Sequence, residues 1–580
     1  MGRFVAIASA ALFEDGEPPL VRQAAAEGWR LSAALGVWRL FAPVGAEPPM
    51  RRLGRDQGLV IGDCFQRGAP AQEAGGSLAR LTGFSPLESA RVLMRSYWGR
   101  YVALLGAGQM SQAAVFRDPS GAVECVTARG GDLIAAASEI PDWLLSALPR
   151  PLSLDWDQIG AIFQAPDQLV HGLALKGLAS VPPGALRQGE VLAPLWRPAD
   201  HALRPLPETE DAAAQLVAQV QESVAAFATG PQPILAEVSG GLDSAIIAQA
   251  LRRADAPVRA WLNYYVDDPW GDERPYARGV ADHAGFALTE APKPGGRVRA
   301  SDFAAGPHGV RPSLFALDPA YDQDLVARAL AVGADAIVTG QGGDAIFFQQ
   351  STQLIAADAW RTRRWRAALS PLPLDLARWT RTPVWSVLKT MIRGQDHTTS
   401  PATPTTCASA HPWLEGLEDL PPAKQLHVRT LLNGQIYYGA SRRTCMLDVR
   451  HPLLSQPMME LALRIPADRL TAGVRDRALA RQAFAGRVPA LVLERPTKGD
   501  LTAVYGRMVA NSLDELRPWL LDGRLAAQGI LDRGQMNALL VPETLIRTGG
   551  YSDILFAAAL EGWVRHWEAR LARRAVGAGL

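Results

Sequence analysis

Short apolar runs separated by turn signals occupy roughly the first two hundred residues of the chain. Residues 101–105 and 113–116 are two such runs, and the turn-forming residues 118–121 separate them from a further run at 123–126. Adjacent apolar runs joined by short turns are typical of antiparallel hairpins. This part of the chain is therefore predicted to form an antiparallel α+β domain.

The pattern changes after residues 192–207 (LAPLWRPADHALRPLP), whose prolines predict a linker between domains. Beyond them, stretches with helical periodicity alternate with short apolar runs. The runs are residues 234–238, 258–262 and 336–338. Such alternation favours a parallel sheet covered by helices, and after Asp344 the pattern is mostly helical. We therefore expect two domains, an α+β domain at 1–205 and an α/β domain with a helical C-terminal part at 206–580.

Charge and cysteine content exclude several classes of function. The 580 residues include 59 Lys and Arg against 58 Asp and Glu, so no overall field attracts nucleic acid or an anionic membrane. The four cysteines are far apart and form no CxxC pair, so neither a zinc site nor a disulfide framework is predicted. They are Cys64, Cys125, Cys407 and Cys445. Inert thiols in a reducing cytoplasm are the favoured interpretation.

The N-terminal residues MGRFVAIASAALFEDG allow two interpretations. Residues 8–10 (ASA) mimic the cleavage site of a signal peptide, but the apolar stretch before them is too short for one. A buried first strand is therefore favoured. No run approaches the length of about 18 apolar residues that a membrane-spanning helix needs, so a cytoplasmic protein is expected.

A glycine turn follows the apolar run at 234–238, within the string SGGLDS at 239–244. Gly240 and Gly241 permit a sharp turn and a close approach of a ligand to the backbone N–H groups. Those groups, together with the N-terminus of the following helix, form a favourable site for phosphate. An ordinary turn in which Ser239 or Asp243 caps the helix is the alternative. The string is not a Walker loop, because no GxxxxGK[ST] pattern occurs around it.

A second glycine turn that ends in an aspartate lies within DAIVTGQGGDAIFFQ, residues 335–349. It follows the apolar run at 336–338, just as the first turn follows the run at 234–238. If the two runs are neighbouring parallel strands, both turns lie at the same edge of the sheet. Ligands bind outside the carboxyl ends of such strands. The two turns are therefore predicted to line one site.

These two turns, together with LDVRHPLL at 447–454 and RPTKGD at 495–500, resemble motifs of the asparagine-synthetase family. The resemblance covers nearly the whole chain and implies a parallel-sheet ATP-pyrophosphatase domain that uses ATP and Mg²⁺. RDPSG at 117–121 and VPPG at 181–184 are similar to the N-terminal-nucleophile glutaminase domain of that family. Working glutaminases there carry Cys directly after the initiator Met, where this chain has Gly2, so the domain is expected to be degenerate.

The resemblance also implies roles for individual residues. The expected ATP-binding residues are Val238, Ser239, Gly240, Gly241, Asp243, Ser244, Gly340 and Arg477, the last in place of a family lysine. Asp243 and Asp344 are expected to hold Mg²⁺, although Asp344 could instead cap a helix. Lys498 matches the catalytic lysine that stabilises an oxyanion, with a solvated loop lysine as the alternative. Gln341 stands where relatives have an acidic residue or tyrosine.

Within the family, TGQGGDAIFFQ and HPLLSQPMMELALRIP look most like the lasso-peptide cyclases, which are macrolactam synthetases. This resemblance implies that the chain adenylates an Asp or Glu side chain of a ribosomal core peptide and joins it to the peptide's N-terminal amine. AMP and pyrophosphate would be released. The implied partners are the precursor peptide, a leader-binding protein and a leader peptidase. A β-lactam or other small-molecule amide synthetase is the alternative enzyme, and an inactive peptide-binding scaffold is the alternative from another class.

Three further segments carry weaker indications. WRTRRWR at 360–366 is basic and aromatic, and is either a solvated helix face or a surface that contacts peptide. Asp448 and Arg450 are expected to form a structural ion pair. HTTSPATPTTCASA at 397–410 has few apolar anchors, so it is predicted to be a loop of low local stability that helps to cover the bound peptide.

Overall fold

The computed structural model of the chain describes most of its length. The described residues are 2–9, 19–69, 74–148, 150–229, 232–394, 411–473, 475–495, 499, 501–548 and 550–577. Lys498 and the predicted loop at 397–410 lie outside these residues.

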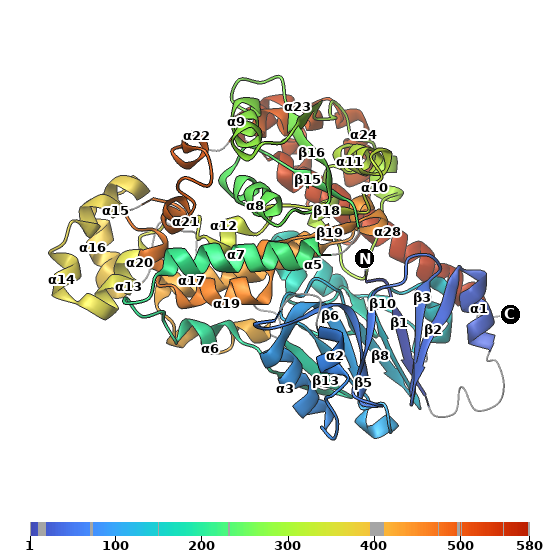
Figure 1. Cartoon of the computed structure of the whole chain (residues 1–580). Helices are drawn as coiled ribbons and strands as arrows, with labels where there is room; N and C mark the ends of the chain where they lie inside the picture. The colour runs from blue at the N-terminus through green and yellow to red at the C-terminus, as the bar shows by residue number, and fades with distance from the viewer. Residues whose placement is uncertain are drawn as a thin grey trace.

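Two antiparallel six-stranded sheets form the N-terminal part of the molecule (Figure 1), as the hairpin pattern predicts. The first has the order β12-β8-β9-β1-β3-β2 and comprises β1 (Val5–Ala8), β2 (Trp29–Leu35), β3 (Trp38–Pro43), β8 (Val126–Gly130), β9 (Leu133–Ala137) and β12 (Ala179–Ser180). The second has the order β14-β13-β7-β6-β5-β4 and comprises β4 (Met50–Leu53), β5 (Gly58–Gln66), β6 (Tyr97–Leu105), β7 (Ala114–Arg117), β13 (Ala185–Gln188) and β14 (Val191–Pro194). Both sheets contribute side chains to one apolar cluster, for example Leu40 from the first and Leu104 from the second. The fully buried β1 agrees with the interpretation of the N-terminal residues as a first strand.

Residues 192–207 are packed against the rest of the molecule, and their role as a linker between domains remains a prediction. The segment contains the end of β14 and the short helix α6 (Pro198–Ala202). Trp196 is 1% exposed, its ring centroid lies 4.9 Å from that of Trp413, and its Nε1 donates to Glu460. The prolines separate apolar side chains, most of which are buried in the main core: Trp196, Ala199, Ala202 and Leu206 are buried, whereas Leu203 is exposed.

A five-stranded parallel sheet follows, as the alternating pattern predicts. Its order is β17-β16-β15-β18-β19, and its strands are β15 (Ile234–Glu237), β16 (Val258–Tyr265), β17 (Leu288–Pro292), β18 (Ala336–Val338) and β19 (Asp448–Arg450). Helices connect these strands and pack beside them (Figure 1), among them α7 (Ala212–Ala228), α8 (Leu242–Arg253), α9 (Arg274–Ala284) and α11 (Pro319–Ala331). Apart from the short β19, the described residues after Asp344 are helical or irregular. The boundary between 205 and 206 remains a prediction.

The register of the sheet brings the two glycine turns together. β15 pairs with β18 through Ala236 and Val338, so both strands end at the same level. The first turn begins after Glu237 and the second after Val338. Because the strands are parallel, both turns emerge at the carboxyl edge of the sheet.

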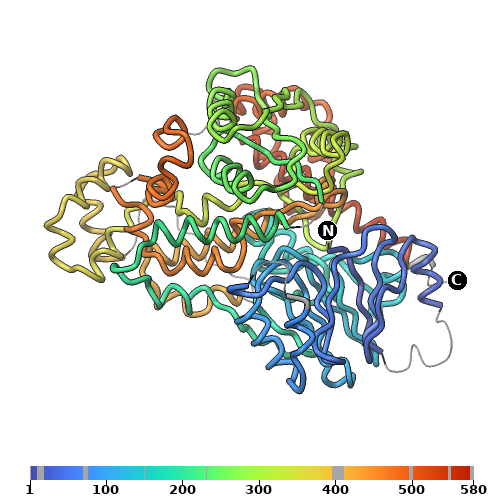
Figure 2. Tube along the Cα trace, in the orientation of Figure 1, coloured from blue at the N-terminus to red at the C-terminus, as the bar shows by residue number. Residues whose placement is uncertain are grey.

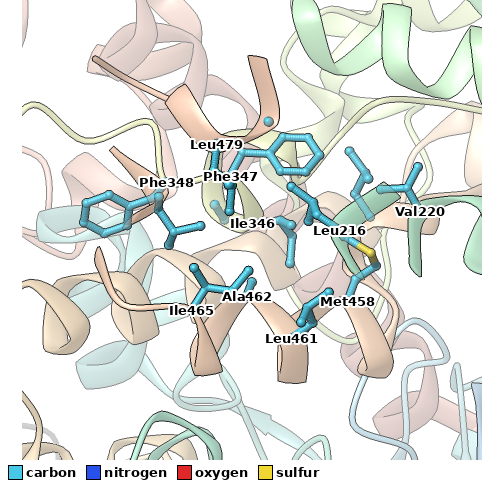
Figure 3. Close-up of a cluster of buried hydrophobic side chains, with 14 of the residues drawn as sticks. Leu216, Val220, Ile346, Phe347, Phe348, Met458, Leu461, Ala462, Ile465 and Leu479 are labelled. Carbon is cyan, nitrogen blue, oxygen red and sulfur yellow. The ribbon is translucent and has the colours of Figure 1, made fainter. Parts of the chain in front are cut away.

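Apolar anchors immediately after the second turn fix its position. Ile346, Phe347 and Phe348 are each at most 1% exposed and follow Asp344 directly. Figure 3 shows them in a cluster with side chains from α7, α19 (Gln456–Arg464) and α21 (Ala478–Ala483). Burying three large apolar groups next to the turn gives it a rigid base.

Contacts between residues far apart in the sequence join the N-terminal sheets to the rest. Arg100 on β6 is 1% exposed and bonds both Asp63 and Asp448, at the start of β19. Figure 2 shows the long C-terminal helix α28 (Tyr551–Gly577) reaching the N-terminal sheets, where Arg570 bonds Asp142. Within the described residues, no helix is both long and apolar enough to cross a membrane.

Candidate active site

A cavity of about 670 Å³ opens at the carboxyl ends of the parallel strands. A volume in this range suits one small-molecule ligand. Among the residues proposed from the sequence, those that line it are Val238, Ser239, Gly241, Asp243, Ser244, Gly340, Gln341, Asp344 and Arg477. Gly240 is not among the residues that line the cavity. A Cβ at this position would lie within 3 Å of Glu273 and Tyr276 in the neighbouring segment.

Hydrogen bonds among its own polar groups shape the first turn. The Ser239 and Ser244 hydroxyls lie 3.1 Å apart, the Ser239 N–H donates to Ser244 Oγ, and the Gly241 N–H donates to Ser239 Oγ. The Ser244 hydroxyl lies 3.0 Å from the Gly241 carbonyl and donates to it. The side chains therefore fold back onto the turn and hold open a backbone loop at the start of α8, where N–H groups and the helix dipole favour an anion.

The two turns touch each other directly because the second turn carries glycines at the contact. A Cβ on Gly343 would lie 2.3 Å from Asp243 Cγ, and one on Gly340 would lie 2.7 Å from the backbone nitrogen of Ser244. No side chain fits at either position without moving Asp243 or the start of α8. The glycines thus set how close the two predicted metal-binding aspartates come.

Arg477 joins the aspartates of the two turns. Its Nη1 lies 3.1 Å from Asp243 Oδ2 and 3.4 Å from Asp344 Oδ1, and its Nε bonds Asp476. Burial by itself lowers the pKa of the Arg477 guanidinium. The negative charges of Asp243, Asp476 and Asp344 have the larger combined effect and raise this pKa. Arg477 also adopts a left-handed backbone with φ of +52°. A non-glycine residue in that conformation costs on the order of 1–3 kcal/mol, and such strain concentrates at functional sites.

The carboxylates fit a Mg²⁺ ion that arrives with phosphate ligands. Asp243 and Asp344 converge on the same nitrogen, so their oxygens surround one position suited to a cation. Among the described residues, no three His, Cys, Asp or Glu side chains gather closely enough to hold a metal by themselves. Mg²⁺ is usually held by one or two carboxylates together with substrate phosphates, which matches this pair.

Gln341 is exposed to the cavity, and hydrogen bonds to neighbouring residues fix the turn on which it lies. Its backbone N–H donates to Thr339 Oγ1, which lies 2.7 Å from His451 Nδ1. His451 Nε2 faces the Tyr437 carbonyl, so Nε2 is the donor and Nδ1 accepts from Thr339. Burial lowers the pKa of His451 to about 3, which keeps this imidazole neutral at ordinary pH. The position of the Gln341 backbone therefore does not depend on its own side chain.

Residues on both sides of Lys498 line the cavity. Arg495 pairs with Glu273 at 2.8 Å and donates to the Gly240 carbonyl, and the Gly499 N–H donates to the same Glu273 carboxylate. Arg495 and Gly499 both belong to the cavity wall. Glu273 thus holds both ends of the RPTKGD motif, and Arg495 attaches the motif to the first turn.

A second cluster of polar residues lies at the wall of the same cavity, and no sequence motif predicts it. Lys293 lies 2.8 Å from Asp318 and 4.0 Å from the centre of the Tyr321 ring. Tyr505 donates to Asp318, and Tyr321 donates to Glu237 at the end of β15. Two of these residues have positions in the sequence that indicate the site, because Glu237 ends the strand β15 and Lys293 directly follows the strand β17, both at the carboxyl edge of the sheet.

A second cavity of about 370 Å³ lies between the N-terminal sheets and the rest of the molecule, and Gly2 lines it. Arg117 joins the two glutaminase-like motifs, donating to the carbonyls of Gly121 and Val181 and to that of Val123. The Arg117 guanidinium therefore holds these two motifs together. His451 lines this second cavity and Thr339 the first, so their hydrogen bond lies in the wall between the two.

A Gly2→Cys variant is expected to have no glutaminase activity. Gly2 has φ of +64°, and a Cβ there would lie 3.3 Å from both methyl groups of Val123. A Gly2→Cys thiol would therefore start from a strained backbone in a space that Val123 occupies. Glutamate release from glutamine should equal that of the matched Gly2→Ala variant. Release in the cysteine variant alone would show that the pocket still works.

Comparison with known proteins places these features in a family. A model described as asparagine synthase matches residues 215–565, more than half of the chain. The chain belongs to the asparagine synthase family. The matched region begins within α7 and ends within α28, so it contains both glycine turns, Arg477 and the RPTKGD motif. Membership indicates an ATP-dependent amide-forming ligase, and Mg²⁺ is typical of such enzymes.

The other comparisons add little to this assignment. No curated protein matches the chain at a significant level. A solved structure of glutamine phosphoribosylpyrophosphate amidotransferase from B. subtilis, complexed with ADP and GMP, is 12% identical and covers 71% of this chain and 94% of its own. Its TM-score is 0.18, which is too low to show a shared fold.

Proposed function

We propose that this asparagine synthase family member is a lasso-peptide cyclase. A side-chain carboxylate of a ribosomal core peptide attacks the α-phosphorus of ATP, and pyrophosphate leaves. The peptide's N-terminal amine then attacks the activated acyl carbon, the amine loses a proton, and AMP leaves. The product is a macrolactam with an isopeptide bond. Its working partners are the precursor peptide, a leader-binding protein and a leader peptidase.

The observation that supports the proposal most is the pair of touching turns with Asp243 and Asp344 beside a cavity of about 670 Å³. The turns present backbone N–H groups and two carboxylates, which suits a nucleotide whose leaving pyrophosphate is bound with Mg²⁺. Gly2 in place of a nucleophilic cysteine argues against ammonia from glutamine as the amine. The amine must then come from another substrate or from the same molecule.

Some residues of the site are proposed to bind the nucleotide, and others to stabilise charge that develops during the reaction. The first turn and Arg477 hold phosphate oxygens, and a bound Mg²⁺ would neutralise charge as pyrophosphate leaves. Lys498 is proposed to stabilise the oxyanion that forms when the amine attacks. Gln341 has no useful basicity, so the substrate amine must already be neutral. Holding the amine and the activated carboxylate of one molecule together can supply several kcal/mol of the rate enhancement.

Release of AMP with different substrates tests the proposal. The protein is incubated with ATP and Mg²⁺ and with one of three additions. These are a core peptide freed of its leader, from a precursor encoded near the gene, or small amino acids, or none. The proposal predicts AMP release with the peptide alone. Release with a small carboxylic acid would indicate a small-molecule amide synthetase. No release and no ATP–pyrophosphate exchange under any condition would indicate a peptide-binding scaffold.

A further inference from the structure

A lobe of four helices projects from the molecule on the side away from the N-terminal sheets (Figure 1). It comprises α13 (Leu354–Arg363), α14 (Trp365–Ala368), α15 (Leu372–Thr380) and α16 (Val384–Arg393), which pack against one another. We call these residues, 354–393, the basic lobe. The two glycine turns, Arg477 and the RPTKGD motif all lie outside the basic lobe.

The basic lobe concentrates positive charge in a protein that is otherwise slightly acidic. Its 40 residues include seven arginines and one lysine, all exposed, against two acids, Asp375 and the buried Asp358. The basic lobe carries +6, and because the whole chain carries +1, the remaining residues together carry −5. Arg363 pairs with Asp468 and Arg378 with Asp375, so most of the positive charge is left over.

Large apolar side chains are exposed among these charges. Leu369 is 87% exposed, Trp385 77%, Trp365 70% and Ile392 65%. On α16, Trp385, Lys389, Ile392 and Arg393 are exposed at helical spacing, whereas the opposite face buries Val387 and Met391. An exposed face that combines Trp and Ile with Lys and Arg is typical of a binding surface rather than of a solvated helix.

The basic lobe is continuous with the active-site cavity. Trp379 of α15 lines that cavity, and so does Ser351, which lies just before α13. A cavity of about 670 Å³ that must also hold a nucleotide has room for the reacting groups of a peptide but not for its remaining residues. Those residues must lie outside the cavity, and the basic lobe adjoins the cavity through Trp379.

We propose that the basic lobe binds the part of the peptide substrate that lies outside the cavity, and that this part carries carboxylates and apolar side chains. The inference rests on the proposed peptide substrate. Lys389 and Arg393 would pair with carboxylates, and Trp385 and Ile392 would cover apolar side chains. Because the charges are exposed, the binding should weaken as the salt concentration rises.

Fluorescence anisotropy with a labelled synthetic peptide of Glu, Leu and Gly tests the surface without catalysis. Lys389→Glu/Arg393→Glu and Trp385→Ala should each weaken binding by about tenfold, the first by charge reversal and the second by loss of an aromatic anchor. The matched control is Arg253→Glu/Arg259→Glu, two exposed arginines at the end of α8 and the start of β16, the sheet edge opposite the cavity. This control should bind as the wild type does, and thermal melts followed by circular dichroism should show that all variants fold.

Three outcomes would overturn the inference. One is equal binding of the acidic peptide by wild-type protein and both lobe variants. Another is equally tight binding of a counterpart with Lys in place of Glu. The third is a wild-type protein that ignores the acidic peptide but binds phosphatidylglycerol vesicles or an oligonucleotide through the same residues, which would make the basic lobe a membrane or nucleic-acid surface.

Steady-state kinetics with the core peptide, freed of its leader, separates this inference from the proposed function. The lobe variants should raise KM for the peptide by about tenfold and leave kcat unchanged, since saturating peptide restores occupancy. An unchanged KM would contradict the role of the basic lobe alone. A wild-type protein without peptide-dependent AMP release would contradict the proposed function, and the anisotropy result would then decide whether the surface binds acidic peptides.

Discussion

Asp243→Asn and Asp344→Asn are each expected to abolish peptide-dependent AMP formation, with a loss of at least about a hundredfold. The two carboxylates come from separate turns and converge on one position, where Arg477 Nη1 lies within 3.4 Å of both. A neutral amide at either position removes a charged ligand from a cation that must balance the phosphate oxygens. ATP–pyrophosphate exchange measures the loss directly.

Asp476→Asn is the matched control for this prediction. Asp476 also lines the cavity and bonds Arg477 through Nε at 2.9 Å, but it belongs to neither glycine turn. Its replacement should cost at most about tenfold, the effect of weakening its ion pairs with Arg477 and Arg481. Normal exchange in Asp243→Asn or Asp344→Asn, or an equal loss in the control, would contradict the metal-binding assignment.

Lys498→Ala is expected to reduce macrolactam formation far more than Gln341→Ala does. Loss of one group that stabilises an oxyanion costs about 10²–10³ in rate. Gln341→Ala should cost tens of fold at most, because an amide is no base and the backbone of residue 341 is held by Thr339 rather than by its own side chain. Product formed per minute, measured at saturating peptide and ATP, compares the two variants.

The pH dependence supplies a second readout for these variants. A peptide α-amine has a pKa of about 8, so its neutral fraction grows as the pH rises towards that value. The pKa of His451 is about 3, so this histidine does not titrate over the same range. The rate limited by chemistry should therefore rise with pH in wild-type protein and in Gln341→Ala alike. A Gln341→Ala variant as inactive as Lys498→Ala, with adenylation intact, would assign Gln341 a direct chemical role.

Local patterns were enough to predict the convergence of the two turns. The runs at 234–238 and 336–338 have the length and composition of buried strands, and the glycines that follow them permit tight turns. Once both strands are parallel and adjacent, covalent connectivity places the turns at one edge. The Asp448–Arg450 ion pair was also predicted, and its atoms lie 2.7 Å apart.

Long-range partners could not be predicted in the same way. Arg100 bonds Asp448 across 348 positions of sequence, and no local pattern indicates which buried arginine meets which aspartate. The polar cluster of Lys293, Asp318 and Tyr505 is assembled from three separate segments for the same reason. Arg477 was expected to contact phosphate as a family lysine does, but its left-handed backbone and its place between two aspartates depend on tertiary packing. The burial of Trp196 against Trp413 is another contact of this kind, because the prolines of residues 192–207 predict turns but not the partners of the side chains between them.

The bond formed in the product shows directly whether the protein is a macrolactam synthetase. Purified protein, ATP, Mg²⁺ and the core peptide, freed of its leader, are incubated, and the peptide is analysed by tandem mass spectrometry. We expect a product lighter by one water, with an N-terminus that no longer reacts with amine reagents and is linked to an Asp or Glu side chain. A core peptide acetylated at its N-terminus should still support ATP–pyrophosphate exchange but give no such product. A core peptide that keeps its mass and its free amine while AMP accumulates would rule out macrolactam formation.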